Sequence, residues 1–175
     1  KHRVRKLLYI ASSCTYPKFA KQPMRPEMLM TGTLEPTNSA YATAKLAGIE
    51  LVRAYCVQHS LNYISVIPAN IFGPGDDFDQ DTSHVIAAIL NKIHRARENG
   101  VSRVEIWGSG TPTREFIYVD DFIDACVFLM EKYDDVTPIN VGSGQVKSIA
   151  EVGEKIKQVI GYEGELCFDT TKPDG

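Results

Sequence analysis

The stretch LLYIASSC, residues 7–14, joins an apolar run of strand length to small polar residues. Such a run predicts a buried strand that ends near Ala11, with Ser12 and Cys14 just beyond its carboxyl end. Open α/β sheets bind their ligands at the carboxyl ends of their strands. We therefore expect this point of the chain to lie in a functional site.

A second motif, YATAK at residues 41–45, follows the turn-forming run PTNS at residues 36–39. That order predicts a helix near 39–59 with a polar start. Tyr41 and Lys45 are four residues apart, so they share one helical face, which continues through Gly48 and Val52. An apolar stripe beside this face is expected to pack on a sheet, and its members are Ala44, Ala47, Leu51 and Tyr55.

Tyrosine and lysine in this arrangement are suited to proton transfer. A tyrosine donates its phenolic proton near neutral pH only if the phenolate is stabilised, and a lysine one turn away supplies positive charge. A serine hydroxyl can hold the oxygen that receives the proton. The Y-x-x-x-K pattern alone is a weak signal, because two such residues often share an exposed helix face, but serines at a strand end strengthen the hypothesis.

The composition is that of a globular protein, since 43% of the 175 residues are hydrophobic and 23% are charged. A formal charge of −3 gives no electrostatic reason to expect nucleic acid. No apolar run approaches the length of a membrane span, so no membrane partner is expected. The cysteines at positions 14, 56, 126 and 167 form no C-x-x-C pair, which predicts reduced thiols and a cytoplasmic location. The histidines lack metal-ligand spacing, so no metal site is expected.

Strand and helix patterns alternate along the chain, which predicts a mostly parallel sheet. Strands are expected near 4–11 and at 63–67, 104–107, 114–118, 139–141 and 166–168. Further helices are expected after the capping run 81–83, after 119–121, and from a capping box at Ser148 to Ile160. The segment 68–74 is rich in Pro and Gly and is expected to leave the sheet. Arg114 is suited to bind phosphate and Trp107 to contact a base or a sugar. The alternative interpretation of 104–118 is a plain hairpin with a core Trp107 and an exposed Arg114.

A complete dinucleotide-binding domain has a Gly-rich turn after its first strand. The sequence contains no such turn, because GSG at 108–110 and GSG at 142–144 come late and open no helix in that pattern. We therefore expect the carboxyl-terminal part of a longer enzyme whose first half is missing. We also expect the 175 residues alone to bind a dinucleotide weakly and to be inactive.

Four stretches carry a resemblance to a known family: SSCTYP at 12–17, YATAK at 41–45, WGSGTPTREF at 107–116 and KPDG at 172–175. They resemble the extended short-chain dehydrogenase/reductases, and within them the NADPH-dependent epimerase-reductases of GDP-sugars. The resemblance implies an α/β fold with a Rossmann-like doubly wound parallel sheet, of which the carboxyl-terminal half is present, and a smaller α/β substrate-binding region. Residues 1–71 would be the second half of the NAD(P)-binding domain. Residues 72–175 would mainly bind substrate, with a return strand to the Rossmann sheet near 138–141.

The resemblance also implies the function and its site residues. The reaction would be epimerisation at C3 and C5 and reduction at C4 of GDP-4-keto-6-deoxy-D-mannose, giving GDP-L-fucose, in a homodimer that uses NADP(H). The implied catalytic residues are Tyr41, Lys45, Ser12, Cys14 and His84. The implied cofactor-binding residues are Ile10, Ala11, Ser12, Ser13, Lys45, Pro68, Ala69, Asn70, Ile71 and His84. The implied substrate-binding residues are Asn70, Lys92, Trp107, Arg114 and Lys172.

Two other functions remain open on the sequence. One is a related epimerase, dehydratase or reductase that acts on a UDP-sugar or a GDP-dideoxysugar with the same Ser12, Tyr41 and Lys45. The other is a non-catalytic homologue that binds a nucleotide sugar. Lys92 stands where the resembled family commonly has arginine, so its contact to a diphosphate would be that of a point charge.

Overall fold

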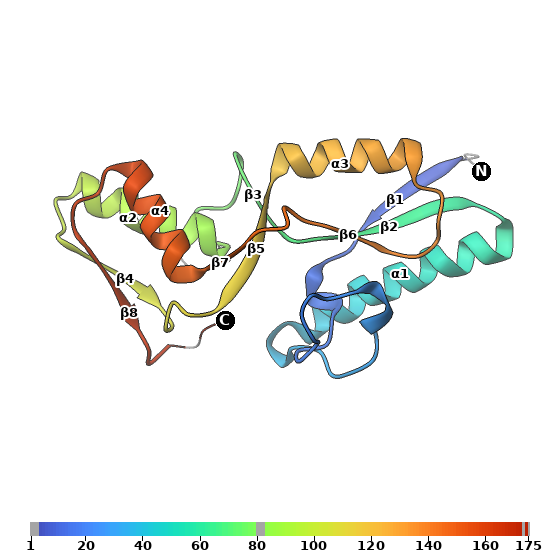
Figure 1. The fold of residues 1–175 in the computed structure, drawn as a ribbon, viewed down its shortest axis with the longest axis horizontal. Helices are drawn as coiled ribbons and strands as arrows, with labels where there is room; N and C mark the ends of the chain where they lie inside the picture. Colours follow the sequence, from blue (N-terminus) through green and yellow to red (C-terminus); the bar gives the residue numbers. More distant parts are fainter. Residues whose placement is uncertain (1–3, 80–82, 173, 175) are drawn as a thin grey trace. The chain divides into compact units, whose positions relative to one another are not determined.

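The computed structural model describes residues 4–79, 83–172 and 174. The chain forms two compact units (Figure 1). The first unit consists of Lys1–Ile71 and Ile117–Ser143, and the second of Phe72–Phe116 and Gly144–Gly175.

The first unit is built on a sheet of three parallel strands: β1 (Lys6–Ile10), β2 (Asn62–Pro68) and β6 (Ile139–Val141). Their order is β1-β2-β6. In register, Ile10 lies opposite Val66 and Pro68 lies opposite Val141. Because parallel strands end at one edge of a sheet, the residues after Ile10 and Pro68 come out on the same side.

Two helices cover the two faces of this sheet, α1 (Ser39–His59) and α3 (Val119–Lys132), as Figure 1 shows. Side chains of β2 alternate between the two faces, as the strand period requires. Ile64 and Val66 share a core with Phe122, Cys126 and Leu129 of α3. On the other face, Ile67 packs with Ile49 of α1. The predicted α/β fold with a parallel sheet is confirmed.

The predicted packing face of α1 is wrong. The helix buries Ala42, Ile49 and Val52. Leu51 and Tyr55 are 59% and 51% exposed, and Ala44 and Ala47 are also exposed. The buried residues lie seven and three positions apart, which places them on one helical face, but alanines and large apolar residues occur all around this helix. The position of the sheet therefore decides which of several apolar faces is covered.

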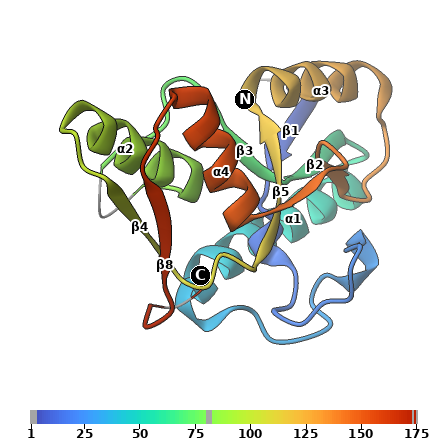
Figure 2. The same ribbon diagram turned by 60° about the vertical axis from the view of Figure 1, so that its left-hand side comes forward.

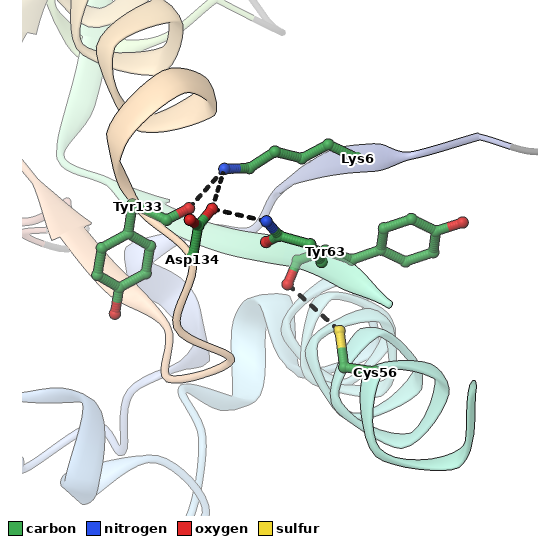
Figure 3. A network of polar contacts seen from close by, with 6 residues as sticks. Lys6, Cys56, Tyr63, Tyr133 and Asp134 are labelled. Carbon is green, nitrogen blue, oxygen red and sulfur yellow. Dashed lines mark hydrogen bonds and ion pairs between the residues drawn. The ribbon is translucent and has the colours of Figure 1, made fainter. Parts of the chain in front are cut away.

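A polar cluster joins the amino ends of β1 and β2 to the end of α3 (Figure 3). Lys6 Nζ donates to the Tyr133 carbonyl at 2.6 Å and pairs with Asp134 Oδ1 at 2.7 Å. Asn62 Nδ2 donates to the same carboxylate oxygen at 2.6 Å. These bonds hold the pKa of Asp134 below its usual range. The cluster lies at the edge opposite to the strand ends that carry Ser12.

The second unit packs two helices on a parallel strand pair (Figure 2). The strands are β4 (Arg103–Trp107) and β8 (Glu165–Asp169), and the helices are α2 (Val85–Glu98) and α4 (Ile149–Ile160). Val104 and Ile106 of β4 point into the core between strands and helices. The predicted capping box begins α4, because Ser148 and Glu151 exchange hydrogen bonds with each other's backbone amides.

Three sequence expectations need correction here. The hairpin alternative for 104–118 is excluded, because β5 (Thr113–Tyr118) pairs with β7 (Val146–Ser148) and not with β4. Trp107 is 57% exposed rather than part of a core. Helix α2 has His84 as its N-cap instead of the run 81–83, of which 81 and 82 lie outside the described residues.

The segment after β2 leaves the first sheet, as expected. Ala69 still donates its amide to the Val141 carbonyl at 2.8 Å. The chain then forms β3 (Asn70–Phe72), which belongs to the sheet of order β3-β5-β7. Among the described residues, no helix is long and apolar enough to cross a membrane.

Candidate active site

Ser12 stands at the carboxyl end of β1 and begins the short helix η1 (Ser13–Thr15). Its side-chain oxygen accepts a hydrogen bond from the Cys14 amide at 3.2 Å. Its carbonyl accepts bonds from the amide and the hydroxyl of Thr15, which is fully buried. This turn fixes the backbone at Ser12 and brings its hydroxyl and the Cys14 side chain to the strand exit.

The Cys14 sulfur has one side-chain partner in the described structure, Asn38. Asn38 Nδ2 donates to Cys14 Sγ at 3.2 Å. Asn38 closes the short helix η3 (Pro36–Asn38) and is the N-cap residue of α1. The loop between β1 and α1 therefore returns to the strand exit and places an amide beside the thiol.

Lys45 connects the first turns of α1 to the end of β1. Its Nζ donates to the Ile10 carbonyl at 3.0 Å and lies 5.6 Å from the centre of the Tyr41 ring. The predicted helical spacing thus brings the ammonium and the phenol to the same carboxyl edge. Tyr41 is 50% exposed, so its hydroxyl can reach a bound molecule.

Tyr9 determines how closely α1 approaches β1. Its ring lies against Gly48, where an added Cβ would collide with the Tyr9 hydroxyl and ring. Tyr9 Oη donates to the Lys45 carbonyl at 3.4 Å, and Lys45 Nζ lies 5.6 Å from the Tyr9 ring centre. Burial raises the pKa of Tyr9, and the nearby Tyr41 adds to this, so Tyr9 stays neutral. Gly48 and Tyr9 thereby hold Lys45 in position.

Three supporting residues were not found from the sequence. Tyr16 is buried, and its hydroxyl donates to Asn140 Oδ1 at 2.6 Å, which ties the segment after η1 to β6. Asn140 Nδ2 in turn donates to the Met24 carbonyl at 2.9 Å. Asn38 is the third, and the sequence marked it only as part of a run that favours turns and helix N-caps. These contacts join positions far apart in the chain, so no local pattern signals them.

In the second unit, two predicted lysines approach one predicted tryptophan. Lys92 Nζ lies 5.1 Å and Lys172 Nζ 5.6 Å from the centre of the exposed Trp107 ring. Lys92 Nζ also donates to the Glu105 carbonyl at 3.1 Å. Two ammonium groups beside an aromatic face form a place suited to an anion with a flat ring.

The turn after Trp107 is held by an aspartate near the end of the chain. The amide and the hydroxyl of Ser109 both donate to Asp174 Oδ1, at 2.6 and 2.9 Å. These bonds, with a smaller contribution from the Arg114 charge, keep the pKa of Asp174 below its usual range. Arg114 Nη1 donates to the Thr113 carbonyl at 2.9 Å. Arg114 thus belongs to the same unit as Trp107 and the two lysines.

The remaining predicted residues are distributed as follows. Ala11 extends β1 by donating its amide to the Val66 carbonyl at 2.8 Å, and Ser13 follows in η1. The run Pro68, Ala69, Asn70 and Ile71 leaves the carboxyl edge beside them. His84 lies exposed at the amino end of α2, in the second unit. The structure therefore brings together Ser12, Cys14, Tyr41 and Lys45 in the first unit.

A parallel α/β sheet with polar side chains gathered beyond the carboxyl ends of its strands is the arrangement at which α/β enzymes bind nucleotide ligands. The model of the NAD dependent epimerase/dehydratase family matches residues 1–142. The chain belongs to this family, which confirms the resemblance seen in the sequence.

Individual known proteins match the chain over nearly its whole length. The chain is 50% identical over 174 residues to GDP-L-fucose synthase 1 of Arabidopsis thaliana, covering 99% of this chain and 54% of the relative. It is 47% identical over 181 residues to GDP-L-fucose synthase of Escherichia coli, covering 98% and 56%. A crystal structure of a GDP-L-fucose synthetase from Naegleria fowleri bound to NADP matches with a TM-score of 0.91 and 34% identity, covering 98% of this chain and 56% of that chain. The chain thus spans about half the length of these relatives.

Proposed function

We propose that the protein carrying this chain is an NADPH-dependent enzyme that converts GDP-4-keto-6-deoxy-D-mannose to GDP-L-fucose. It would epimerise C3 and C5 and then reduce C4. The observation that carries the proposal is the group Ser12, Cys14, Tyr41 and Lys45, which one unit holds at the carboxyl edge of its sheet. The names and the cofactor of the relatives above support the same substrate and NADP(H).

The residues present fit the nicotinamide end of the cofactor. Lys45 has three ammonium donors, of which one is used on the Ile10 carbonyl, so the others can bind a ribose hydroxyl. The edge formed by Ile10, Ala11, Ser13 and the run Pro68–Ile71 is where dinucleotides bind in such sheets. When bound, NADPH supplies the hydride for C4. No residue of this chain is assigned to the pyrophosphate.

Epimerisation follows from the acidity of carbons next to a carbonyl. The Cys14 thiolate takes a proton from C3 or C5, the electron pair of the broken C–H bond forms an enolate, and negative charge collects on O4. The Ser12 oxygen accepts from the Cys14 amide, so its hydroxyl hydrogen can be donated to O4 together with that of Tyr41. His84 is our proposed donor of the proton returned to the opposite face of the carbon.

Reduction uses the tyrosine and the lysine. As C4 receives hydride, Tyr41 gives its phenolic proton to O4, and the positive charge of Lys45 stabilises the phenolate that remains. The ammonium lies 5.6 Å from the ring centre, close enough for this attraction at a partly exposed site.

We assign the GDP part of the substrate to the second unit. The paired lysines at Trp107 offer positive charge and an aromatic face, and Arg114 offers a planar fork for phosphate oxygens. Asn70 stays a predicted contact to both substrate and cofactor. A homodimer and a cytoplasmic location belong to the same proposal. The exposed Leu51 and Tyr55 of α1 support a dimer interface, and the free cysteines support the location.

The test is an assay of the protein at the full length of its relatives with GDP-4-keto-6-deoxy-D-mannose and NADPH. We expect NADPH oxidation and a GDP-L-fucose product identified by NMR. A UDP-4-keto-6-deoxy-sugar is the matched control and should react far more slowly. Preference for the UDP-sugar would favour the related UDP-sugar enzyme, and binding of either without turnover would favour a non-catalytic homologue.

A further inference from the structure

The side chain of Asn38 does not do what an asparagine at a helix N-cap normally does. An N-cap asparagine usually accepts a hydrogen bond from an amide in the first helical turn through its Oδ1, which stabilises the helix. Asn38 is the N-cap of α1, yet its side chain makes no capping hydrogen bond. Its Oδ1 is buried and has no hydrogen-bond partner among the described residues.

The other end of the same amide explains this arrangement. Asn38 Nδ2 lies 3.2 Å from Cys14 Sγ and donates to it. A side chain that gives up a stabilising cap and leaves a buried oxygen unpaired is held for another purpose, since both features are unfavourable for folding. The geometry indicates that this purpose is the hydrogen bond to Cys14 Sγ.

A thiolate has only lone pairs, so it is stabilised by hydrogen-bond donors and not by acceptors. The backbone N–H of Cys14 already donates to the Ser12 side-chain oxygen, so it is not the donor for the sulfur. Among the described side chains, Asn38 is the one that donates to Cys14 Sγ. We propose that Asn38 is a positioning residue for Cys14, holding the sulfur at the strand exit and donating an N–H to its thiolate form.

This inference rests on the role that the proposed function gives to Cys14. The amide has a donor at one end and an acceptor at the other, so a half-turn of its plane would let Oδ1 accept from the protonated thiol. Asn38 can therefore accompany the sulfur as it loses and regains the proton that it exchanges with C3 or C5. An aspartate of the same size could serve only the protonated form.

Two variants separate a functional role from a structural one. Asn38→Ser and Asn38→Asp both place good N-cap residues at the start of α1, so helix stability is kept or improved. Serine is too short to reach the sulfur, and aspartate brings an acceptor and a negative charge in place of the donor. A loss of folding in either variant would be visible as a lower unfolding temperature.

The measurement is the rate of Cys14 alkylation by iodoacetamide against pH, with each cysteine followed by peptide mass spectrometry in the native protein. The thiolate is a charged acceptor at a partly exposed site. Removing one hydrogen-bond donor from it should make the thiolate fraction about tenfold smaller at pH values below the midpoint of the alkylation curve. The half-maximal pH of alkylation should therefore rise by about one unit in Asn38→Ser. It should rise further in Asn38→Asp, because the carboxylate repels the thiolate. The midpoint is compared, because altered access to the thiol changes the plateau rate instead.

Two controls accompany the experiment. Cys56, whose sulfur donates to the Tyr63 carbonyl at 3.3 Å (Figure 3), should keep its midpoint in every variant. Ser148→Ala removes a helix cap in the second unit and should leave the Cys14 midpoint where it is. An unchanged Cys14 midpoint in the folded Asn38 variants, or an equal shift at Cys56, would overturn the inference. The alkylation is measured without substrate. Its outcome for Asn38 and Cys14 is therefore independent of whether the protein has the proposed activity.

Discussion

The proposed binding of the GDP-sugar can be tested at a single charged residue, Arg114. We expect Arg114→Ala in the protein at the full length of its relatives to weaken GDP-sugar binding by about tenfold, because a charge-assisted contact to phosphate is lost. Isothermal titration measures the affinity, and the unfolding temperature measures stability. Arg103→Ala removes the same charge from β4 in the same unit and should leave affinity unchanged. A fall in stability with equal affinity would mean that Arg114 only supports its strand.

Cys14 has a separate and measurable consequence. In Cys14→Ser, deuterium uptake from solvent at C3 and C5 of the substrate should fall by at least about a hundredfold, the usual contribution of a general base. A serine hydroxyl is a far weaker base than a thiolate, and the backbone at residue 14 can keep its bond to Ser12. Mass spectrometry of the recovered GDP-sugar follows the uptake. Exchange at the rate of the unaltered protein would remove Cys14 from the mechanism.

At this scale, sequence spacing predicts only what a helix or strand repeats locally. The four-residue spacing of Tyr41 and Lys45 was enough to place them on one face. The contact between Asn38 and Cys14 joins residues 24 positions apart, and the bond between Tyr16 and Asn140 joins residues 124 apart. Such contacts depend on how the loop returns to the sheet, and no periodicity contains that information.

At the scale of elements, the polar cluster at the amino edge of the sheet makes stability depend on pH. The Asp134 pKa is lowered, first by the hydrogen bond from Lys6 and then by that from Asn62. A carboxylate with a lowered folded-state pKa stabilises the fold above its unfolded pKa of about 4, and this contribution is lost as the pH falls through the lower folded-state pKa. Asp134→Asn should therefore lower the unfolding temperature at pH 7, with a smaller difference at about pH 3.

The control for this prediction is Asp124→Asn, which removes an exposed carboxylate from the middle of α3. Its unfolding temperature should follow that of the unaltered protein at both pH values. If Asp134→Asn matched the unaltered protein at neutral pH, the cluster in Figure 3 would contribute nothing to the junction of β1, β2 and α3.

Element types were predictable because apolar periodicity and capping residues are local. The strands at β1, β2 and β6 and the capping box of α4 follow from such patterns. The packing face of α1 and the strand that pairs with β4 could not be predicted from local patterns, because each depends on a distant element. β4 pairs with β8, about 60 residues later, although β5 is its neighbour in the chain.

At the scale of the whole molecule, the division into two units separates two kinds of predicted residue. Ser12, Cys14, Tyr41 and Lys45 belong to the first unit, and Lys92, Trp107, Arg114 and Lys172 to the second. The family model covers residues 1–142, which include all of the first unit except Ser143 and also residues 72–116 of the second. The chain covers 54% of its Arabidopsis relative. The complete reaction is accordingly a property that we propose for the longer protein.

The most direct measurement compares Tyr41→Phe with the unaltered protein, at the full length of its relatives, in D2O with GDP-4-keto-6-deoxy-D-mannose and NADPH. Tyr41 donates the proton that reduction requires, whereas Cys14 removes the protons at C3 and C5. We therefore predict that Tyr41→Phe oxidises NADPH at least about a hundredfold more slowly. Deuterium should still enter the substrate at both carbons, with a smaller loss of rate than that of NADPH oxidation, because Ser12 still donates to O4 of the enolate. NADPH oxidation at nearly the rate of the unaltered protein would contradict the central claim that Tyr41 and Lys45 form the reducing site.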